Sequence, residues 1–223
     1  MSRPTIKLAV FDLDGTLTRS GTSVLRHVGR EFGFAAKADR LAALYADRVL
    51  TNAEVSRDAA ESLRGRHRRD LEHALESLPM VEGIAETVAL LHGLQVCCAL
   101  ATITFDFAAQ YVARKFGFTR VSATPLEWSQ DDRLTGNVPV ALEGRDKCDF
   151  IERQCAELAI SRRQVLVVGD AHSDIPAMRM AGWSVGFNPT AEVERLASVS
   201  LRGSDLGEVV PHIRHLLGDP PLP

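Results

Sequence analysis

Short apolar runs rich in β-branched residues recur along the chain and predict buried strands. They lie at 5–11, 95–101, 121–124, 164–168 and 184–187. Segments with helical spacing of apolar residues separate these runs. An alternation of this kind predicts a parallel sheet with helices on both faces. We therefore expect an α/β fold with a Rossmann-like core.

The stretch 18–78 has a different character, because no strand-like run occurs in it. Its apolar residues recur at helical spacing: Val24, Leu25, Val28 and Phe32, then Leu41, Leu44 and Tyr45, then Leu71, Leu75 and Leu78. This pattern predicts a small bundle of helices inserted directly after the first strand. We expect a core domain formed by 1–17 and 79–223 and a helical domain formed by 18–78.

Helical spacing in the rest of the chain predicts helices near 84–93, 108–116, 147–158, 175–181 and 206–217. The polar stretch 129–137 interrupts this pattern and predicts a hairpin or a surface excursion. The proline-rich end, 219–223, predicts a frayed terminus.

Charged and hydroxyl side chains gather at the ends of three predicted strands. Asp12 and Asp14 follow the first, Thr102 stands at the end of 95–101, and Asp170 and Asp174 follow 164–168. In a parallel sheet these strand ends meet at one edge, where ligands collect. The helix that Lys147 opens can reach the same edge.

Several acids in one crevice repel one another unless a cation or a proton lies between them. Carboxylate oxygens suit Mg²⁺, which also bridges phosphate groups. The hydroxyl of Thr102 and the ammonium of Lys147 can bind phosphate oxygens. One carboxylate then remains free to attack phosphorus, and another can exchange protons.

Each of these residues also has a plainer interpretation. Asp12 and Asp14 can be turn residues, and D-x-D-G runs occur in calcium loops, although the late glutamate of an EF-hand is missing here. Thr102 can satisfy a strand end, Lys147 can lie at the surface, and Asp174 can cap a helix. Their joint occurrence at one sheet edge favours the chemical interpretation.

On these residues the chain resembles the haloacid dehalogenase superfamily of phosphohydrolases. Residues 11–17 (FDLDGTL) match its first motif, Ala101 and Thr102 the second, Lys147 the third, and residues 169–174 (GDAHSD) the fourth. Residues 102–106, 134–137 and 170–187 are most similar to the phosphoserine phosphatase branch. The helical stretch 18–78 matches the position of that branch's cap domain.

The resemblance implies a role for each matched residue. Asp12 would be the nucleophile and a Mg²⁺ ligand. Asp14 would protonate the leaving alkoxide, activate water, and touch the metal through its backbone carbonyl. Asp170 would bind Mg²⁺, and Asp174 would be a ligand or would orient one.

Thr102 and Lys147 would hold the transferring phosphoryl group. Gly15, Thr16 and Ile103 complete the residues that we expect to bind the substrate. The implied protein is a Mg²⁺-dependent phosphomonoester hydrolase that forms an aspartyl phosphate on a small organic phosphate. The alternatives are a phosphotransferase that uses another hydroxyl acceptor and a non-catalytic binding or regulatory protein on the same fold.

Departures from the branch weigh against phosphoserine itself as the substrate. Gly15 stands where the branch usually has serine, and Ile103 and Thr104 replace two glycines. The branch carries an acid just beyond the first motif, which pairs with the serine amine. This chain has none there before Glu31.

The composition argues against several other classes of protein. The 223 residues are 45% hydrophobic and 25% charged with a net charge of −3, which is typical of a soluble globular protein and gives no reason to expect nucleic acid. No apolar run approaches the roughly 20 residues that span a membrane. The first residues lack the apolar segment of a signal peptide, so we expect a cytoplasmic protein. The four cysteines show no CxxC spacing and predict reduced thiols.

A basic run at 64–69 (RGRHRR) allows two interpretations. It can be a solvated helix end or loop, or it can draw anionic substrates towards a cleft. Arg19, Arg48 and Arg57 are further candidates to contact a second anionic group. Neither the substrate nor the oligomeric state follows from the sequence.

Overall fold

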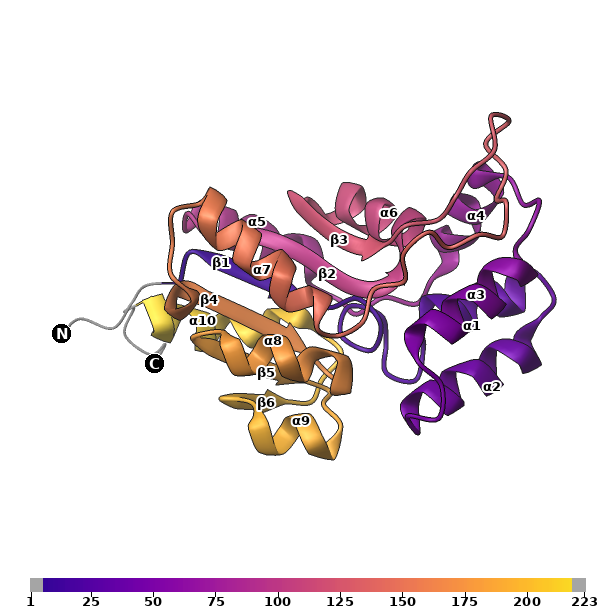
Figure 1. The fold of residues 1–223 in the computed structure, drawn as a ribbon. Coiled ribbons are helices and arrows are strands. Elements are labelled where there is room, and N and C mark those ends of the chain that lie inside the picture. Colours follow the sequence, from indigo (N-terminus) through magenta and orange to yellow (C-terminus); the bar gives the residue numbers. More distant parts are fainter. Residues whose placement is uncertain (1–5, 218–223) are drawn as a thin grey trace.

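A six-stranded parallel sheet forms the centre of the computed structural model, which describes residues 6–217 (Figure 1). Its strands are β1 (Leu8–Phe11), β2 (Cys97–Phe105), β3 (Arg120–Thr124), β4 (Val165–Gly169), β5 (Trp183–Phe187) and β6 (Val199–Leu201). They pair in the order β3-β2-β1-β4-β5-β6. The predicted α/β fold is confirmed. Strand β1 lies between β2 and β4.

Two strands differ from the prediction. β2 continues to Phe105, so Thr102 lies inside it and not at its end. Threonine, isoleucine and phenylalanine favour extended backbone, and pairing with β3 resumes at Phe105 after a register shift beyond Ala101. The pattern of apolar residues did not predict β6, a half-buried edge strand of three residues. Thr5, where the first predicted run begins, lies outside the described residues.

Alternate residues of the strands pack on opposite faces of the sheet. Ala9 and Phe11 face α5 (Ile84–Gly93), α6 (Asp106–Phe116) and α10 (Val210–Leu217). Leu8 and Val10 face α7 (Asp146–Glu157), α8 (Ile175–Met180) and α9 (Ala191–Leu196). Single 3₁₀ turns occur at Leu75–Ser77, Arg162–Gln164, His172–Asp174 and Leu206–Val209.

The segment 18–78, which we call the helical insertion, lies beyond the carboxyl ends of the strands (Figure 1). It contains α1 (Val24–Glu31), α2 (Ala35–Ala46), α3 (Asn52–Ser62) and α4 (Arg68–Ala74). Leu25 and Leu63 of the insertion belong to the same apolar cluster as Phe11 of the sheet. The predicted helices after the first strand are therefore confirmed, whereas the domain limits at 17/18 and 78/79 stay a prediction.

The predicted surface excursion at 129–137 is part of a slightly longer stretch, 127–137, which we call the excursion and which reaches over to the insertion (Figure 1). Its two arms are joined by hydrogen bonds such as Thr135 N–H to the carbonyl of Glu127 (3.0 Å). The amide of Gly65 donates to the carbonyl of Leu134 (2.7 Å), so the excursion also pairs with the turn before α4. The predicted frayed end at 219–223 lies outside the described residues.

The described cysteines are all free thiols, and Cys97 and Cys98 pack on opposite faces of the sheet as their adjacent positions predict. Within residues 6–217, no helix combines the length and the apolar character that crossing a membrane requires.

Candidate active site

Three carboxylates converge at the carboxyl ends of β1 and β4. Asp12 follows β1, Asp170 follows β4, and Asp174 lies one turn further along the chain. One carboxylate oxygen of each lies within 4.8 Å of the others. Asp12 and Asp174 are buried, and Asp170 is half-buried. A set of hard oxygen donors this close together fits a divalent cation such as Mg²⁺.

Lys147 inserts between two of these acids. It is the second residue of α7, its side chain is only 4% exposed, and its Nζ donates to Asp12 Oδ1 (2.5 Å) and Asp174 Oδ1 (2.6 Å). Burial alone would lower the pKa of Lys147, but the two carboxylates outweigh it and hold that pKa above its ordinary value. The lysine therefore stays charged, and its interpretation as a surface residue is wrong.

Burial has the opposite effect on the pKa values of the acids. It raises the pKa of Asp12 to about 7, with a further upward push from Asp174 that Lys147 partly offsets. The pKa of Asp170 is also raised well above its ordinary value, first by burial and then by the charges of Asp174 and Asp12. One ammonium group does not balance three clustered carboxylates, which is the electrostatic reason that the cluster suits a cation.

Asp14 is held where the chain leaves the sheet for the insertion. Its Oδ1 accepts the backbone N–H of Val24, the first residue of α1, at 2.7 Å. Burial raises the pKa of Asp14 to about 6, although the Val24 hydrogen bond opposes the shift. A carboxyl group with such a pKa can exchange protons near neutral pH.

Two glycines allow the acidic loops to approach one another closely. Gly15 has φ +85°, and a Cβ atom there would lie 2.4 Å from Asp170 Oδ2. A Cβ atom at Gly169 would lie 2.4 Å from Asp174 Cγ. Thr16 is buried, and its hydroxyl donates to Asp170 Oδ1 at 3.2 Å. Gly15 therefore lies at the site, and Thr16 lies behind the acidic cluster.

Asp174 stands at the N-cap position of α8 but makes no capping hydrogen bond with its side chain. Its Oδ2 instead accepts the backbone N–H groups of Asp170 (3.1 Å) and Ala171 (3.2 Å), while Oδ1 accepts from Lys147. Asp174 therefore occupies the helix N-cap position, as the plainer interpretation expected, but its side chain does not cap the helix. Its side chain orders the loop that carries Asp170.

Thr102 and Ile103 lie on the β2 side of the site. Thr102 is fully buried, and its Oγ1 accepts the amide of Thr104 at 3.2 Å. The carbonyl of Ile103 accepts from the hydroxyl of Thr124 (2.7 Å) and from Asn52 Nδ2 (3.0 Å). Strand β2, strand β3 and the insertion thus fix the backbone beside Thr102.

A cavity of about 300 Å³ lies over these residues, with Asp12, Asp14, Asp170 and Thr102 on its core side. The insertion supplies the opposite wall, which is largely apolar: Leu25, Ala42, Ala46, Val55 and Ala59. This volume is at the lower end of the range for small-molecule sites. The described arrangement can therefore enclose a small phosphate ester.

Beside the cavity, the end of α2 and the turn beyond it contact segments that follow β4 and β5. The ring of Tyr45 packs against the ring of His172 with centroids 4.7 Å apart. Arg48 forms an ion pair with Glu192. Burial, followed by the charge of Arg48, lowers the pKa of His172, so this contact joins Tyr45 to a neutral ring at neutral pH.

Arg26 and Asn52 are among the cavity residues that the sequence did not single out. Arg26 lines the cavity from α1, and Asn52 lines it from the start of α3. Buried Asn52 also donates to the carbonyl of Leu142 (2.7 Å), in the loop before α7. The sequence carries no signal for either contact, because both depend on the tertiary position of the insertion.

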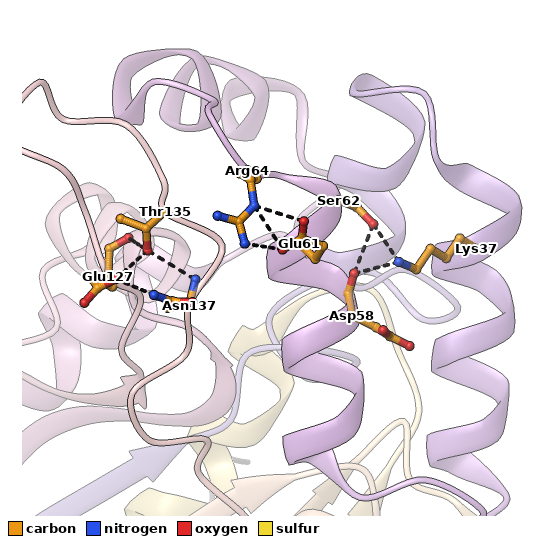
Figure 2. Close-up of polar contacts among 8 residues, drawn as sticks. All are labelled: Lys37, Asp58, Glu61, Ser62, Arg64, Glu127, Thr135 and Asn137. Carbon is orange, nitrogen blue, oxygen red and sulfur yellow. Dashed lines mark hydrogen bonds and ion pairs between the residues drawn. The ribbon is translucent and has the colours of Figure 1, made fainter.

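The basic residues that the sequence did single out make local contacts elsewhere. Figure 2 shows Arg64 held by Glu61, with a shortest distance of 2.5 Å. Arg66 lies over the ring of Phe32, and Arg68 lies over the ring of Trp128. None of these, nor Arg19, Arg48 or Arg57, lines the cavity described above. The contacts favour the interpretation of 64–69 as a solvated helix end or loop.

The chain is similar to known hydrolases in sequence. The model of the haloacid dehalogenase-like hydrolase family matches residues 9–179. The phosphoserine phosphatase of Methanocaldococcus jannaschii is 24% identical over 209 residues, covering 93% of this chain and 98% of that protein. The phosphoserine phosphatase of Albidiferax ferrireducens is 29% identical over 215 residues, covering 92% and 88%.

Solved structures show the same fold. A phosphoserine phosphatase structure described as a phospho-aspartyl intermediate analogue matches with a TM-score of 0.82 and 23% identity, covering 93% of this chain and 99% of that one. A haloacid dehalogenase family hydrolase from Salmonella enterica matches with a TM-score of 0.85 and 15% identity, covering 93% and 70%.

Proposed function

The chain belongs to the haloacid dehalogenase-like hydrolases, and we propose that it hydrolyses small organic phosphate monoesters with the help of Mg²⁺. The observation that carries this proposal is the convergence of Asp12, Asp170, Asp174 and Lys147 beneath a small cavity. The curated relatives named above are phosphoserine phosphatases, which supports the same reaction class.

In the first step, a carboxylate oxygen of Asp12 attacks phosphorus and the bond to the ester oxygen breaks, which leaves an aspartyl phosphate. Asp14 gives its proton to the departing alkoxide. Its pKa of about 6 leaves part of it protonated near neutral pH. In the second step, Asp14 takes a proton from water, which attacks phosphorus, releases inorganic phosphate and restores Asp12.

Positively charged and hydroxyl groups stabilise the phosphoryl group during both steps. Lys147 is charged and already hydrogen-bonded to Asp12, so it is placed beside the reacting oxygen. Thr102 supplies a hydroxyl from β2. Mg²⁺, held by Asp12, Asp170, Asp174 and the backbone carbonyl of Asp14, would neutralise phosphoryl charge.

We also propose that 18–78 is a cap domain over a core formed by 1–17 and 79–223. The insertion supplies the wall of the cavity that faces the acids, and closing such a wall excludes water from the reacting groups. The cap would therefore select the organic part of the substrate.

A panel of phosphorylated metabolites, phosphoserine included, tests the proposal. We expect phosphate release that requires Mg²⁺, and we expect Asp12→Asn to lower kcat on the order of 10⁴-fold or more, because it removes the nucleophile. Asp131→Asn, at an exposed position of the excursion, is the matched control. Release of inorganic phosphate, measured with and without hydroxyl acceptors, separates hydrolysis from phosphotransfer. Undiminished turnover by Asp12→Asn would contradict the assignment of the nucleophile.

A further inference from the structure

The charges that line the cavity are unevenly distributed. On the core side all of them are negative: Asp12, Asp14 and Asp170. On the wall that the insertion supplies, the one charged side chain among the described lining residues is Arg26. A ligand whose phosphoryl group meets the acids and Lys147 therefore extends towards a single cation.

The position of Arg26 is set by its helix. Helix α1 begins with Val24, whose amide donates to Asp14, and Ser23 caps the helix by accepting the amide of Arg26 at 3.2 Å. The first turn of α1 is thus tied to the loop that carries the proton donor. Arg26 lies within this turn, so its backbone has little freedom to move away from the site.

A neighbouring acid, Asp39, orients the guanidinium group of Arg26 but does not occupy all of its hydrogen-bond donors. Its Nε–H donates to Asp39 Oδ1 at 3.1 Å, and the side chain is 29% exposed. An arginine has five N–H donors in a planar fork, and this contact uses one of them. The terminal nitrogens can therefore receive a carboxylate or phosphate in bidentate fashion.

An ammonium group finds no comparable partner on this wall. Besides Arg26, the lining residues that the insertion contributes are neutral throughout the part of the chain that the structure describes. Glu143 faces the neighbouring hollow, and its carboxylate accepts the amide of Ala53 at 3.2 Å. Of the three acids on the core side, Asp12 and Asp170 belong to the cluster that suits a cation, and Asp14 accepts the amide of Val24.

We infer that the preferred substrates are small phosphate monoesters with a second anionic group at the far end and no ammonium group, and that Arg26 binds this second anion. The inference rests on the proposed phosphatase function and names its substrate class. It also assigns a specificity-determining role to a residue outside the family motifs.

A matched series of esters tests this inference. The probes are propyl phosphate and its analogues with a terminal carboxylate, a terminal phosphate or a terminal ammonium group. With Mg²⁺ present, we expect kcat/KM for at least one of the two anionic esters to exceed that for propyl phosphate by about 10- to 100-fold, because a hydrogen bond between charged groups contributes this much. The ammonium ester should be the poorest substrate.

Variants of Arg26 give the decisive comparison. Arg26→Gln should lower the ratio of kcat/KM for the preferred anionic ester to that for propyl phosphate by about tenfold or more, chiefly through KM. Arg26→Lys, which keeps the charge but not the fork, should lower it less. Arg30→Gln, at an exposed position of the same helix, is the control and should leave the ratio unchanged.

The outcomes separate the two proposals. If the wild type hydrolyses propyl phosphate but shows no preference for an anionic ester, or if Arg26→Gln keeps the full preference, the inference about Arg26 is wrong and the phosphatase function stands. If the wild type hydrolyses none of these esters and no metabolite of the panel, the proposed function itself fails. Activity of Arg26→Gln and Arg26→Lys towards propyl phosphate shows that both variants fold.

Discussion

At the scale of single residues, charge balance explains the arrangement of the site. Asp12, Asp170 and Asp174 meet one cation, Lys147, so the ionised cluster carries a formal charge of −2. A divalent cation would neutralise it. Without a cation, burial and mutual repulsion raise the pKa values of Asp12 and Asp170. Protons then reduce the negative charge of the cluster.

This balance predicts a pH-dependent effect of Mg²⁺ on stability. In the metal-free protein the pKa of Asp12 rises from 3.8 to about 7, so its contribution to stability is complete below its ordinary pKa and is lost as the pH rises through about 7. Because Mg²⁺ competes with these protons, it should raise the thermal midpoint more at about pH 8 than at about pH 5. Thermal unfolding with and without Mg²⁺ measures this, with Asp170→Asn as a variant that should lose most of the increment. Equal increments at the two pH values would contradict the charge-balance account.

Gly15 shows how tightly the acidic loops are packed. Its positive φ and the 2.4 Å approach of Asp170 Oδ2 to the position of a Cβ atom leave no room for a side chain. We expect Gly15→Ala to displace Asp170 and to lower kcat/KM by about tenfold or more. Gly33→Ala is a suitable control, since Gly33 also has positive φ but open space around it. If Gly15→Ala retained activity at the level of Gly33→Ala, the close approach would have no functional importance.

The prediction of the site from the sequence rested on the types of residue at the ends of the strands. Carboxylates directly after β1 and β4, and a lysine at the start of α7, are visible without coordinates, and the structure brings them together. Arg26 and Asn52 could not be predicted in this way. Each is a polar residue on a helix, and only the folding of the insertion over the sheet shows what it contacts.

At the scale of secondary-structure elements, Asn52 connects three segments around the candidate active site. Its Nδ2 donates to the carbonyl of Ile103, which lies within β2 next to Thr102, and to the carbonyl of Leu142 before α7. Its own backbone begins α3. Strand β2 carries Thr102 and α7 carries Lys147. Asn52 is therefore a positioning residue that ties the insertion to both elements.

Replacing this side chain should loosen all three elements. We expect Asn52→Ala to lower the free energy of unfolding by about 1–3 kcal/mol, since two carbonyl groups lose a donor in a buried place. It should also lower kcat/KM by about tenfold, because Thr102 and Lys147 lose part of their fixed geometry. The control is Asn137→Ala at an exposed position, where Asn137 binds Glu127 (Figure 2). Chemical denaturation and steady-state kinetics measure the two effects, and similar behaviour of both variants would contradict the role of Asn52.

The elements themselves were predictable to different degrees. Short apolar runs predicted the five strands β1 to β5, whereas β6 offers only three residues and no clear alternation. Helix α3 was not identified as a separate helix, because alanines make up much of its buried side. Its start was nevertheless visible in the sequence, since Thr51 and Glu54 form a capping box.

At the scale of the whole molecule, the insertion and the sheet share one apolar core. The cluster that contains Phe11, Leu100 and Val168 of the sheet also contains Leu25, Val28, Leu41, Leu63 and Leu71 of the insertion. The excursion at 127–137 adds backbone hydrogen bonds to the turn before α4. The sequence predicted the order of these parts, but not that their packing is continuous.

Continuous packing predicts cooperative unfolding. Trp128 reports on the excursion beside the insertion, and Trp183 reports on β5. In Trp183→Phe and in Trp128→Phe, we expect the fluorescence transition of the remaining tryptophan to coincide with the loss of far-ultraviolet circular dichroism in the same variant. A transition of Trp128 at clearly lower temperature than the loss of secondary structure would show that the insertion unfolds independently.

The account depends on a covalent phosphoryl-enzyme formed at Asp12. Acid quenching during turnover, reduction with borohydride and peptide mass spectrometry detect an acyl phosphate, because reduction converts the phosphorylated aspartate to homoserine. We predict that this conversion occurs at residue 12 and requires both Mg²⁺ and a phosphate ester that the protein hydrolyses. Steady phosphate release without conversion at residue 12, or conversion at a different aspartate, would contradict the account.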